Sequence, residues 1–93
     1  MSQNDAVDLS KGIHIFSSDY CPYCISAKRL LASKNVQWNE FKVDGQYELR
    51  EKMAQLAGKR SVPQIWIQGK HIGGCDDLYL LEDKGELDSL LAL

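Results

Sequence analysis

Two cysteines separated by two residues, in Cys21-Pro22-Tyr23-Cys24, are the strongest chemical signal in this sequence. Thiol–disulfide exchange needs a thiolate that attacks a sulfur and a second thiol close enough to resolve the resulting mixed disulfide. A spacing of two residues allows that closeness. The pair therefore indicates redox chemistry, with Cys21 as the nucleophile and Cys24 as the resolving thiol.

The expected position of Cys21 supports this role. A β-prone run over 13–16 is followed by polar residues 17–19, and a helical apolar periodicity begins at Pro22. Cys21 would thus precede a helix N-terminus, where unpaired N–H groups and the helix dipole favour a thiolate. A stabilised thiolate gains little in attack, because its nucleophilicity falls with its basicity, but it leaves faster from a mixed disulfide.

Periodicity and turn residues predict the middle of the chain. The first helix can end at Asn35 in the left-handed conformation. A second strand is expected over 36–43, although the apolar alternation slips by one residue near Asn39 and suggests a bulge or bend. A second helix is expected over 47–57, with Gly58 placed to end it.

The last third of the chain predicts a hairpin and two helical segments. Strands over 64–68 and 71–72 would be joined by a two-residue turn at Gly69-Lys70. Asp76 or Asp77 can cap the next helix, and a short amphipathic segment follows over 87–91.

The element order is therefore βαβαββαα. A right-handed crossover makes the first two strands parallel, and the hairpin extends the same sheet in mixed fashion. The sequence predicts an α/β, thioredoxin-like fold, with a central four-stranded mixed sheet flanked by helices.

Length and charge narrow the class of protein. Ninety-three residues with 11 basic and 13 acidic side chains fit one domain, and a formal charge of −2 argues against binding nucleic acid by phosphate neutralisation. The first eleven residues resemble neither a signal peptide nor a membrane anchor. We expect a flexible tail over 1–10, a domain over 11–93, a monomer and a cytoplasmic location, where a Cys-x-x-Cys pair indicates redox catalysis or metal binding.

Three separated blocks carry a family resemblance: Cys21-Pro22-Tyr23-Cys24 with the nearby Ala27-Lys28 and Leu30-Leu31, then 61–65, then 73–78. In this order they resemble the dithiol glutaredoxins, especially the small bacterial kind. The resemblance implies reduction of protein disulfides and glutathione mixed disulfides, with glutathione as the reducing co-substrate and no metal. It also implies ribonucleotide reductase as a client.

The same resemblance implies a binding site for glutathione. It implies a cis bond between Val62 and Pro63, so that Val62 pairs with a peptide-like ligand, and a Tyr23 ring that shapes the groove. It assigns the turn at 73–74 and the helix start near Cys75 to the γ-glutamyl end. There, helix N–H groups suit a carboxylate, and an Asp carboxylate suits an amine. The expected glutathione-binding residues are Tyr23, Arg60, Val62, Pro63, Gly74, Cys75, Asp76 and Asp77.

Ser18 departs from the family pattern. The family often carries a Lys there, which helps to hold the glycine carboxylate of glutathione and favours the thiolate. Arg60, Lys59 or Arg50 are the candidates to supply that charge instead.

Three rival functions stay open. Cys21, Cys24, His71 and Cys75 would supply a Cys₃His set of the kind zinc accepts. Related monothiol glutaredoxins share an iron–sulfur cluster between two chains, but they lack the second cysteine of the motif. A thioredoxin would have Gly-Pro between its cysteines. Neither His14 nor His71 has an obvious partner for catalysis, and Cys75 is expected to be a small buried residue or an oxidation-sensitive thiol.

Overall fold

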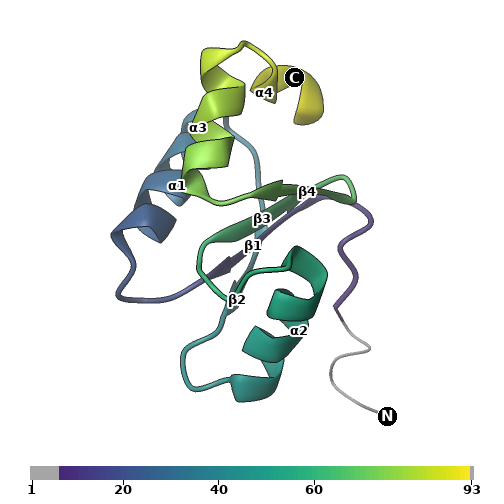
Figure 1. Ribbon diagram of the computed structural model, residues 1–93. Helices are drawn as coiled ribbons and strands as arrows, with labels where there is room; N and C mark the ends of the chain where they lie inside the picture. The colour runs from purple at the N-terminus through teal and green to yellow at the C-terminus, as the bar shows by residue number, and fades with distance from the viewer. Residues whose placement is uncertain (1–6, 93) are drawn as a thin grey trace.

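A four-stranded mixed sheet organises the chain in the computed structural model, which describes residues 7–92 (Figure 1). The strand order is β2-β1-β3-β4, with β1 parallel to β2 and the other two pairs antiparallel. The predicted thioredoxin-like fold and its element order are confirmed. The elements are β1 (Ile13–Ser17), α1 (Pro22–Ser33), β2 (Asn39–Lys42), α2 (Tyr47–Ala57), β3 (Gln64–Ile67), β4 (Lys70–Gly73), α3 (Cys75–Asp83) and α4 (Leu87–Leu90).

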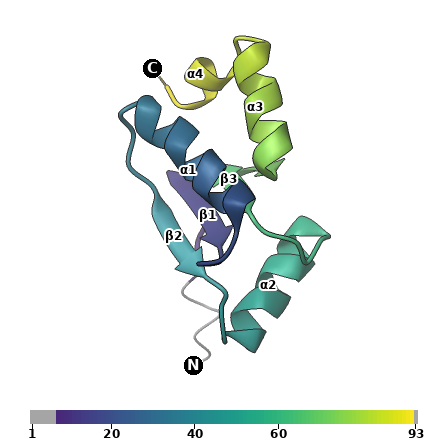
Figure 2. The same cartoon turned by 90° about the vertical axis from the view of Figure 1, so that its left-hand side faces the viewer.

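Alternating side chains of the two central strands build a core on each face of the sheet. Ile15 of β1 and Ile65 of β3 are fully buried among side chains of α1, α3 and α4. Phe16 and Trp66, the next residues along, lie in the second core with Met53 of α2. Two views related by 90° show α1 beside α3 and α2 away from both (Figures 1 and 2). The sheet therefore separates α1 and α3 from α2.

The second strand is shorter than predicted. It covers Asn39–Lys42 rather than 36–43. Val36 and Trp38 lie before it and pack, partly buried, against the core under α1 and α3, whereas Phe41 packs against the core under α2. The slip in alternation thus marks the start of the strand, because the apolar residues on its two sides serve different cores.

The hairpin turn lies one residue earlier than predicted. Its central residues are Gln68 and Gly69 rather than Gly69-Lys70, and Lys70 begins β4. Both central residues have positive φ, 50° and 82°. This is the pattern of a type I′ turn, whose twist matches that of the flanking strands.

The predicted C-terminal ends of α1 and α2 are confirmed. Asn35, with φ 58°, follows α1, and Gly58, with φ 76°, ends α2, so both stop their helices in the left-handed region. Helix α2 has the predicted bounds. None of the helices within residues 7–92 is long and apolar enough to cross a membrane.

Part of the expected N-terminal tail lies against the domain. Val7 and Leu9 pack, partly buried, against the core that contains Trp66. Residues 1–6 of that predicted tail lie outside the described residues. The domain boundary at residue 11 stays a prediction.

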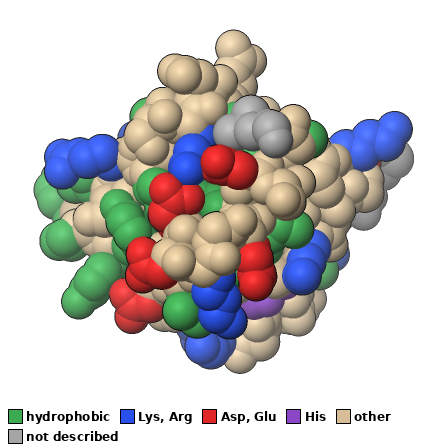
Figure 3. Space-filling model, turned by 90° about the horizontal axis from the view of Figure 1, so that it is seen from above, with side chains coloured by type: hydrophobic (Ala, Val, Ile, Leu, Met, Phe, Trp, Pro, Cys, Tyr) green, Lys and Arg blue, Asp and Glu red, His purple; other side chains and the backbone are tan. Residues whose placement is uncertain are grey.

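Lys34 joins three helices at one end of the molecule. Its Nζ lies 2.8 Å from Glu82 Oε1 on α3 and 2.8 Å from Asp88 Oδ1 on α4. Figure 3, which looks down on the end where α3 and α4 lie, shows acidic side chains beside basic ones. Charges of both signs are therefore interspersed on this face.

Helix α3 offers a matched test of its attachment to the core. Leu78 is fully buried, whereas Leu80 on the same helix is 51% exposed. We expect Leu78→Ala to lower the free energy of unfolding by about 2–5 kcal/mol, because it leaves a cavity. The control, Leu80→Ala, should change it by less than about 0.5 kcal/mol. Urea denaturation followed by circular dichroism measures both, and equal effects would contradict this account of the core.

Candidate active site

Cys21 is the N-cap residue of α1, as predicted from the sequence. Its extended backbone, with φ −129° and ψ 102°, precedes Pro22, which needs no N–H at the first helical position. The Cys21 Sγ accepts a hydrogen bond of 3.1 Å from the backbone N–H of Cys24. The helix start therefore donates to the sulfur, which is the contact a thiolate needs.

Cys24 sits one turn inside the helix and is fully buried. Burial, followed by its hydrogen bond with Cys21, raises the pKa of the Cys24 thiol to about 12, whereas the backbone of Ser18 and the charge of Lys28 oppose that rise. Cys21 itself therefore helps to keep Cys24 protonated. That contribution ends once the Cys21 sulfur is bonded to a substrate.

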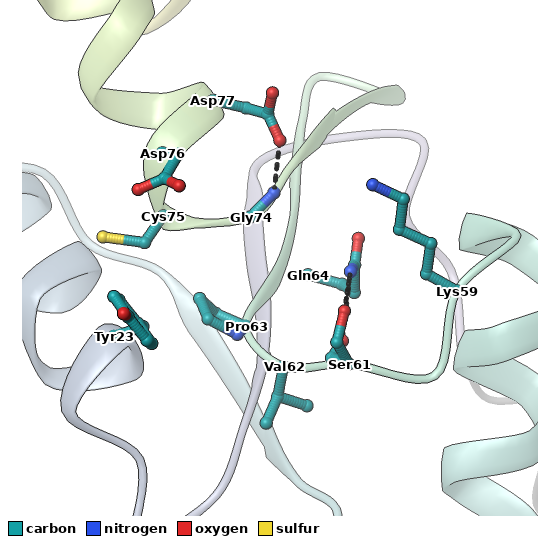
Figure 4. Close-up of a pocket in the computed structure, with 10 residues that line it drawn as sticks. All are labelled: Tyr23, Lys59, Ser61, Val62, Pro63, Gln64, Gly74, Cys75, Asp76 and Asp77. Atoms are coloured by element: carbon teal, nitrogen blue, oxygen red, sulfur yellow. Dashed lines mark hydrogen bonds between the residues drawn. The ribbon is translucent and has the colours of Figure 1, made fainter.

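An open groove of about 210 Å³ lies beside Cys21. The link is Val62, because the Cys21 thiol donates to the Val62 carbonyl over 3.7 Å and Val62 lines the groove. The bond between Val62 and Pro63 is cis. Figure 4 shows Tyr23 and Lys59 at opposite ends. The lining residues are Tyr23, Lys59, Ser61, Val62, Pro63, Gln64, Gly74, Cys75, Asp76 and Asp77.

The start of α3 forms one wall of this groove. The N-cap of α3 is Gly74 rather than Asp76 or Asp77, because the helix already begins at Cys75. The backbone N–H of Gly74 donates to Asp77 Oδ2 over 2.9 Å, so Asp77 caps the helix from its third position (Figure 4). Gly73 has φ 116°, and a Cβ there would overlap the Asp77 carboxylate. Glycine is thus needed at residue 73 for both conformation and space. The exposed Asp76 carboxylate also faces the groove.

The three candidate cations lie in different places. Lys59 lines the groove. Arg60 instead directs its guanidinium to Glu51, and Arg50 Nη1 donates to the Arg60 carbonyl over 2.7 Å. The groove therefore has Lys59 as a lining cation, and Arg60, the expected binding residue, lies in an ion pair with α2.

Ser18 takes part in a different contact from the Lys that the family pattern places there. Its hydroxyl donates to Asp44 Oδ1 over 2.5 Å, and the backbone N–H of Asp19 donates to Asp44 Oδ2 over 2.9 Å. These hydrogen bonds lower the pKa of the Asp44 carboxyl. The loop before Cys21 is thus anchored to Asp44, which follows β2.

A charged cluster that the sequence did not predict joins α1 to β1 and β2. Glu40 Oε2 accepts from the buried Ser17 Oγ over 2.6 Å and from Lys28 Nζ over 2.9 Å. Burial alone would raise the pKa of the Glu40 carboxyl, but the hydrogen bonds from Ser17 and Lys28 outweigh it, and the pKa is lowered. Only the parallel register, which brings β2 beside β1, could have revealed this cluster.

Cys75 is buried beside the groove, and burial followed by the charges of Asp76 and Cys21 raises the pKa of its thiol. His71 Nε2 lies 2.8 Å from Gln64 Oε1, and its ring lies 4.6 Å from that of Trp66. Among residues 7–92 there is no group of three or more His, Cys, Asp or Glu side chains that could hold a metal ion. The Cys₃His set considered for zinc is therefore not assembled.

The sequence matches both a known protein family and individual known proteins. The glutaredoxin family model matches residues 13–72. The chain is 53% identical over 78 residues to the glutaredoxin of Pseudomonas aeruginosa, covering 84% of this chain and 93% of that protein. It is 49% identical over 79 residues to glutaredoxin 3 of Escherichia coli K12, covering 85% and 95%.

Solved structures of glutaredoxins also resemble this chain in fold. The crystal structure of a buckwheat glutaredoxin–glutathione complex superposes with a TM-score of 0.84 at 31% identity, covering 90% of this chain and 79% of that one. The solution structure of glutaredoxin from Brucella melitensis gives a TM-score of 0.78 at 46% identity, covering 90% and 91%.

The Glu40 cluster makes stability depend on pH. A carboxyl whose pKa is lowered by folding stabilises the fold above its unfolded pKa, and that stabilisation is lost as the pH falls through its folded pKa. We expect Glu40→Gln to be about 1–3 kcal/mol less stable than wild type at pH 7, with the difference shrinking below about pH 4. Urea midpoints at several pH values, with the exposed Glu86→Gln as control, measure this. A difference that does not vary with pH would refute it.

Proposed function

This chain belongs to the glutaredoxin family, and we propose that it reduces glutathione mixed disulfides and protein disulfides through Cys21 and Cys24, with glutathione as reductant. The observation that carries the proposal is the contact between the nucleophilic sulfur and the groove: the Cys21 Sγ lies 3.7 Å from the carbonyl of Val62, a groove residue. A tripeptide in the groove would thus present its own sulfur to Cys21.

The two ends of the groove suit the two ends of glutathione. Lys59 supplies a cation for the glycine carboxylate. At the wall that α3 forms, the N-terminus of the helix suits the γ-glutamyl carboxylate, and the carboxylates of Asp76 and Asp77 suit its amine. The backbone of Val62 lies between them and would pair with the middle of the peptide. Tyr23, Pro63, Gly74 and Cys75 supply the remaining walls, whereas Arg60 acts on α2.

The reaction then follows from the positions of the two sulfurs. The Cys21 thiolate attacks the glutathione sulfur of a mixed disulfide, and the protein thiolate leaves. A second glutathione attacks the bound glutathione sulfur, so that Cys21 departs as a thiolate and glutathione disulfide forms. The backbone N–H of Cys24 donates to the departing sulfur. For a protein disulfide, Cys24 attacks the Cys21 sulfur and releases the substrate thiolate instead.

The cysteines and the exposed rings beside them bear on where the protein acts and on how it meets protein substrates. A Cys-x-x-Cys pair used for redox catalysis fits the reducing cytoplasm, where we propose that the protein acts. The aromatic rings of Tyr20 and Tyr23 on either side of Cys21 are 94% and 64% exposed. They offer apolar surface to a protein substrate beside the reactive sulfur.

The proposed division of labour predicts different effects of the two cysteines. With a small glutathione mixed disulfide as substrate and glutathione as reductant, Cys21→Ser should abolish turnover, because no nucleophile remains. Cys24→Ser should retain it, because glutathione itself can release Cys21. A coupled assay of glutathione disulfide measures both rates. Turnover by Cys21→Ser, or none by wild type, would reject the proposed function.

Substituting Lys59 and Arg60 in turn tests which of them supplies the cation that binds glutathione. We expect Lys59→Ala to raise KM for the glutathione mixed disulfide about threefold with little change in kcat, since an exposed ion pair is worth about 0.2–1 kcal/mol. Arg60→Ala should leave KM unchanged. The Lys59 effect should also fade at high salt. A larger effect from Arg60→Ala would assign the cation to Arg60 instead.

A further inference from the structure

The cluster of Lys28, Glu40 and Ser17 lies beside Cys24 and has no part in the mechanism so far. Lys28 follows Cys24 by four residues on α1, so the two side chains lie one turn apart on the same face of the helix. Glu40 fixes the ammonium, because its Oε2 accepts from Lys28 Nζ over 2.9 Å and from Ser17 Oγ over 2.6 Å. Ser17 is fully buried in β1. The cation is thus held by Glu40 of β2, and Glu40 is in turn fixed by Ser17 of the neighbouring strand β1.

Cys24 needs a nearby positive charge more than Cys21 does. It is fully buried, whereas the Cys21 sulfur already accepts from the helix N-terminus. To resolve a mixed disulfide, Cys24 must lose its proton in an environment that disfavours a buried anion. Any fixed cation next to it therefore acts directly on the resolving step.

Formation of the mixed disulfide changes what surrounds Cys24. The free Cys21 sulfur contributes a hydrogen bond and, as a thiolate, a negative charge, and both disfavour ionisation of Cys24. Both disappear when the Cys21 sulfur is bonded to substrate. The backbone of Ser18 and the charge of Lys28, which favour ionisation, remain.

We propose that Lys28, held by Glu40 and Ser17, is a positioning residue that stabilises the Cys24 thiolate as it forms for the resolving attack. This inference builds on the proposed function of the cysteine pair. In the step, the Cys24 proton passes to solvent and its thiolate attacks the Cys21 sulfur. The Cys21–substrate bond breaks, the Cys21–Cys24 bond forms, and the substrate sulfur leaves as a thiolate that carries the electron pair.

The two thiols can be timed separately with a chromogenic aromatic disulfide, dithionitrobenzoate, which needs no glutathione. In a Cys75→Ser background, attack by Cys21 releases one coloured thiolate, and resolution by Cys24 releases the second. Cys24→Ser should give only the first phase. Stopped-flow absorbance therefore measures the two steps in one molecule at a series of pH values.

Lys28→Met should slow the second phase and leave the first unchanged within about twofold. If loss of the charge lowers the thiolate fraction of Cys24 tenfold, a Brønsted slope of about 0.4–0.5 returns about threefold in reactivity, so the net slowing is about threefold. This slowing should persist at every pH where the rate still rises with pH. Lys28→Arg should restore the wild-type rate, and the exposed Lys84→Met should match wild type.

The controls separate the possible failures. An unchanged second phase in Lys28→Met, equal slowing of both phases, or no rescue by Lys28→Arg would overturn the role of Lys28. If Lys28→Met does not fold, Lys28→Gln, which can still donate to Glu40, receives the same measurements and the same criteria. Absence of glutathione turnover in wild type would instead reject the proposed function, and it would leave the two-phase result intact.

Discussion

The site depends on one hydrogen bond, from the backbone N–H of Cys24 to the Cys21 sulfur. It exists because β1 ends just before a helix begins, so the first cysteine is a cap and the second an interior residue. Pro22 fits the first helical position, since it has no N–H to satisfy there. Helix α1 packs on the sheet through its buried residues. Pro63, with its cis peptide bond, and the start of α3 line the groove beside the start of α1.

This arrangement gives two chemically similar thiols opposite duties. Cys21 is 9% exposed and is the N-cap residue of α1, so the backbone N–H of Cys24 can donate to its sulfur during both attack and departure. Cys24 is fully buried, and burial together with the neighbouring Cys21 sulfur keeps it protonated. Only the contribution of Cys21 ends when the mixed disulfide forms. A resolving thiol that ionised too readily would close the Cys21–Cys24 disulfide before glutathione could act. Burial of Cys24 therefore favours the route through glutathione and leaves resolution as a second, controlled step.

Local signals predicted most of the fold, and long-range contacts account for what they missed. Asn35 and Gly58 marked helix ends because single residues favour the left-handed region. The sequence predicted the hairpin turn one residue too late. Gln is uncommon at positive φ, and Gly69 fits a turn at 68–69 as well as one at 69–70. The Ser17–Glu40–Lys28 cluster was missed entirely, since it joins residues from three elements and only the β1–β2 register brings them together. Lys59 and Arg60 are adjacent in sequence, and only the structure shows that Lys59 lines the groove while Arg60 pairs with Glu51.

The proposed binding mode also accounts for a serine at residue 18, where the family often carries a cation. A zwitterionic tripeptide needs opposite charges at the two ends of its site, but it does not need the cation on a particular loop. Here Ser18 and the backbone N–H of Asp19 both donate to Asp44, and a lysine at residue 18 would remove the hydroxyl bond from Ser18. Lys59 reaches the groove from the turn after α2 and leaves the anchor intact. Rigidity beside the nucleophile and charge at the end of the groove are thereby supplied by different residues, which can vary independently.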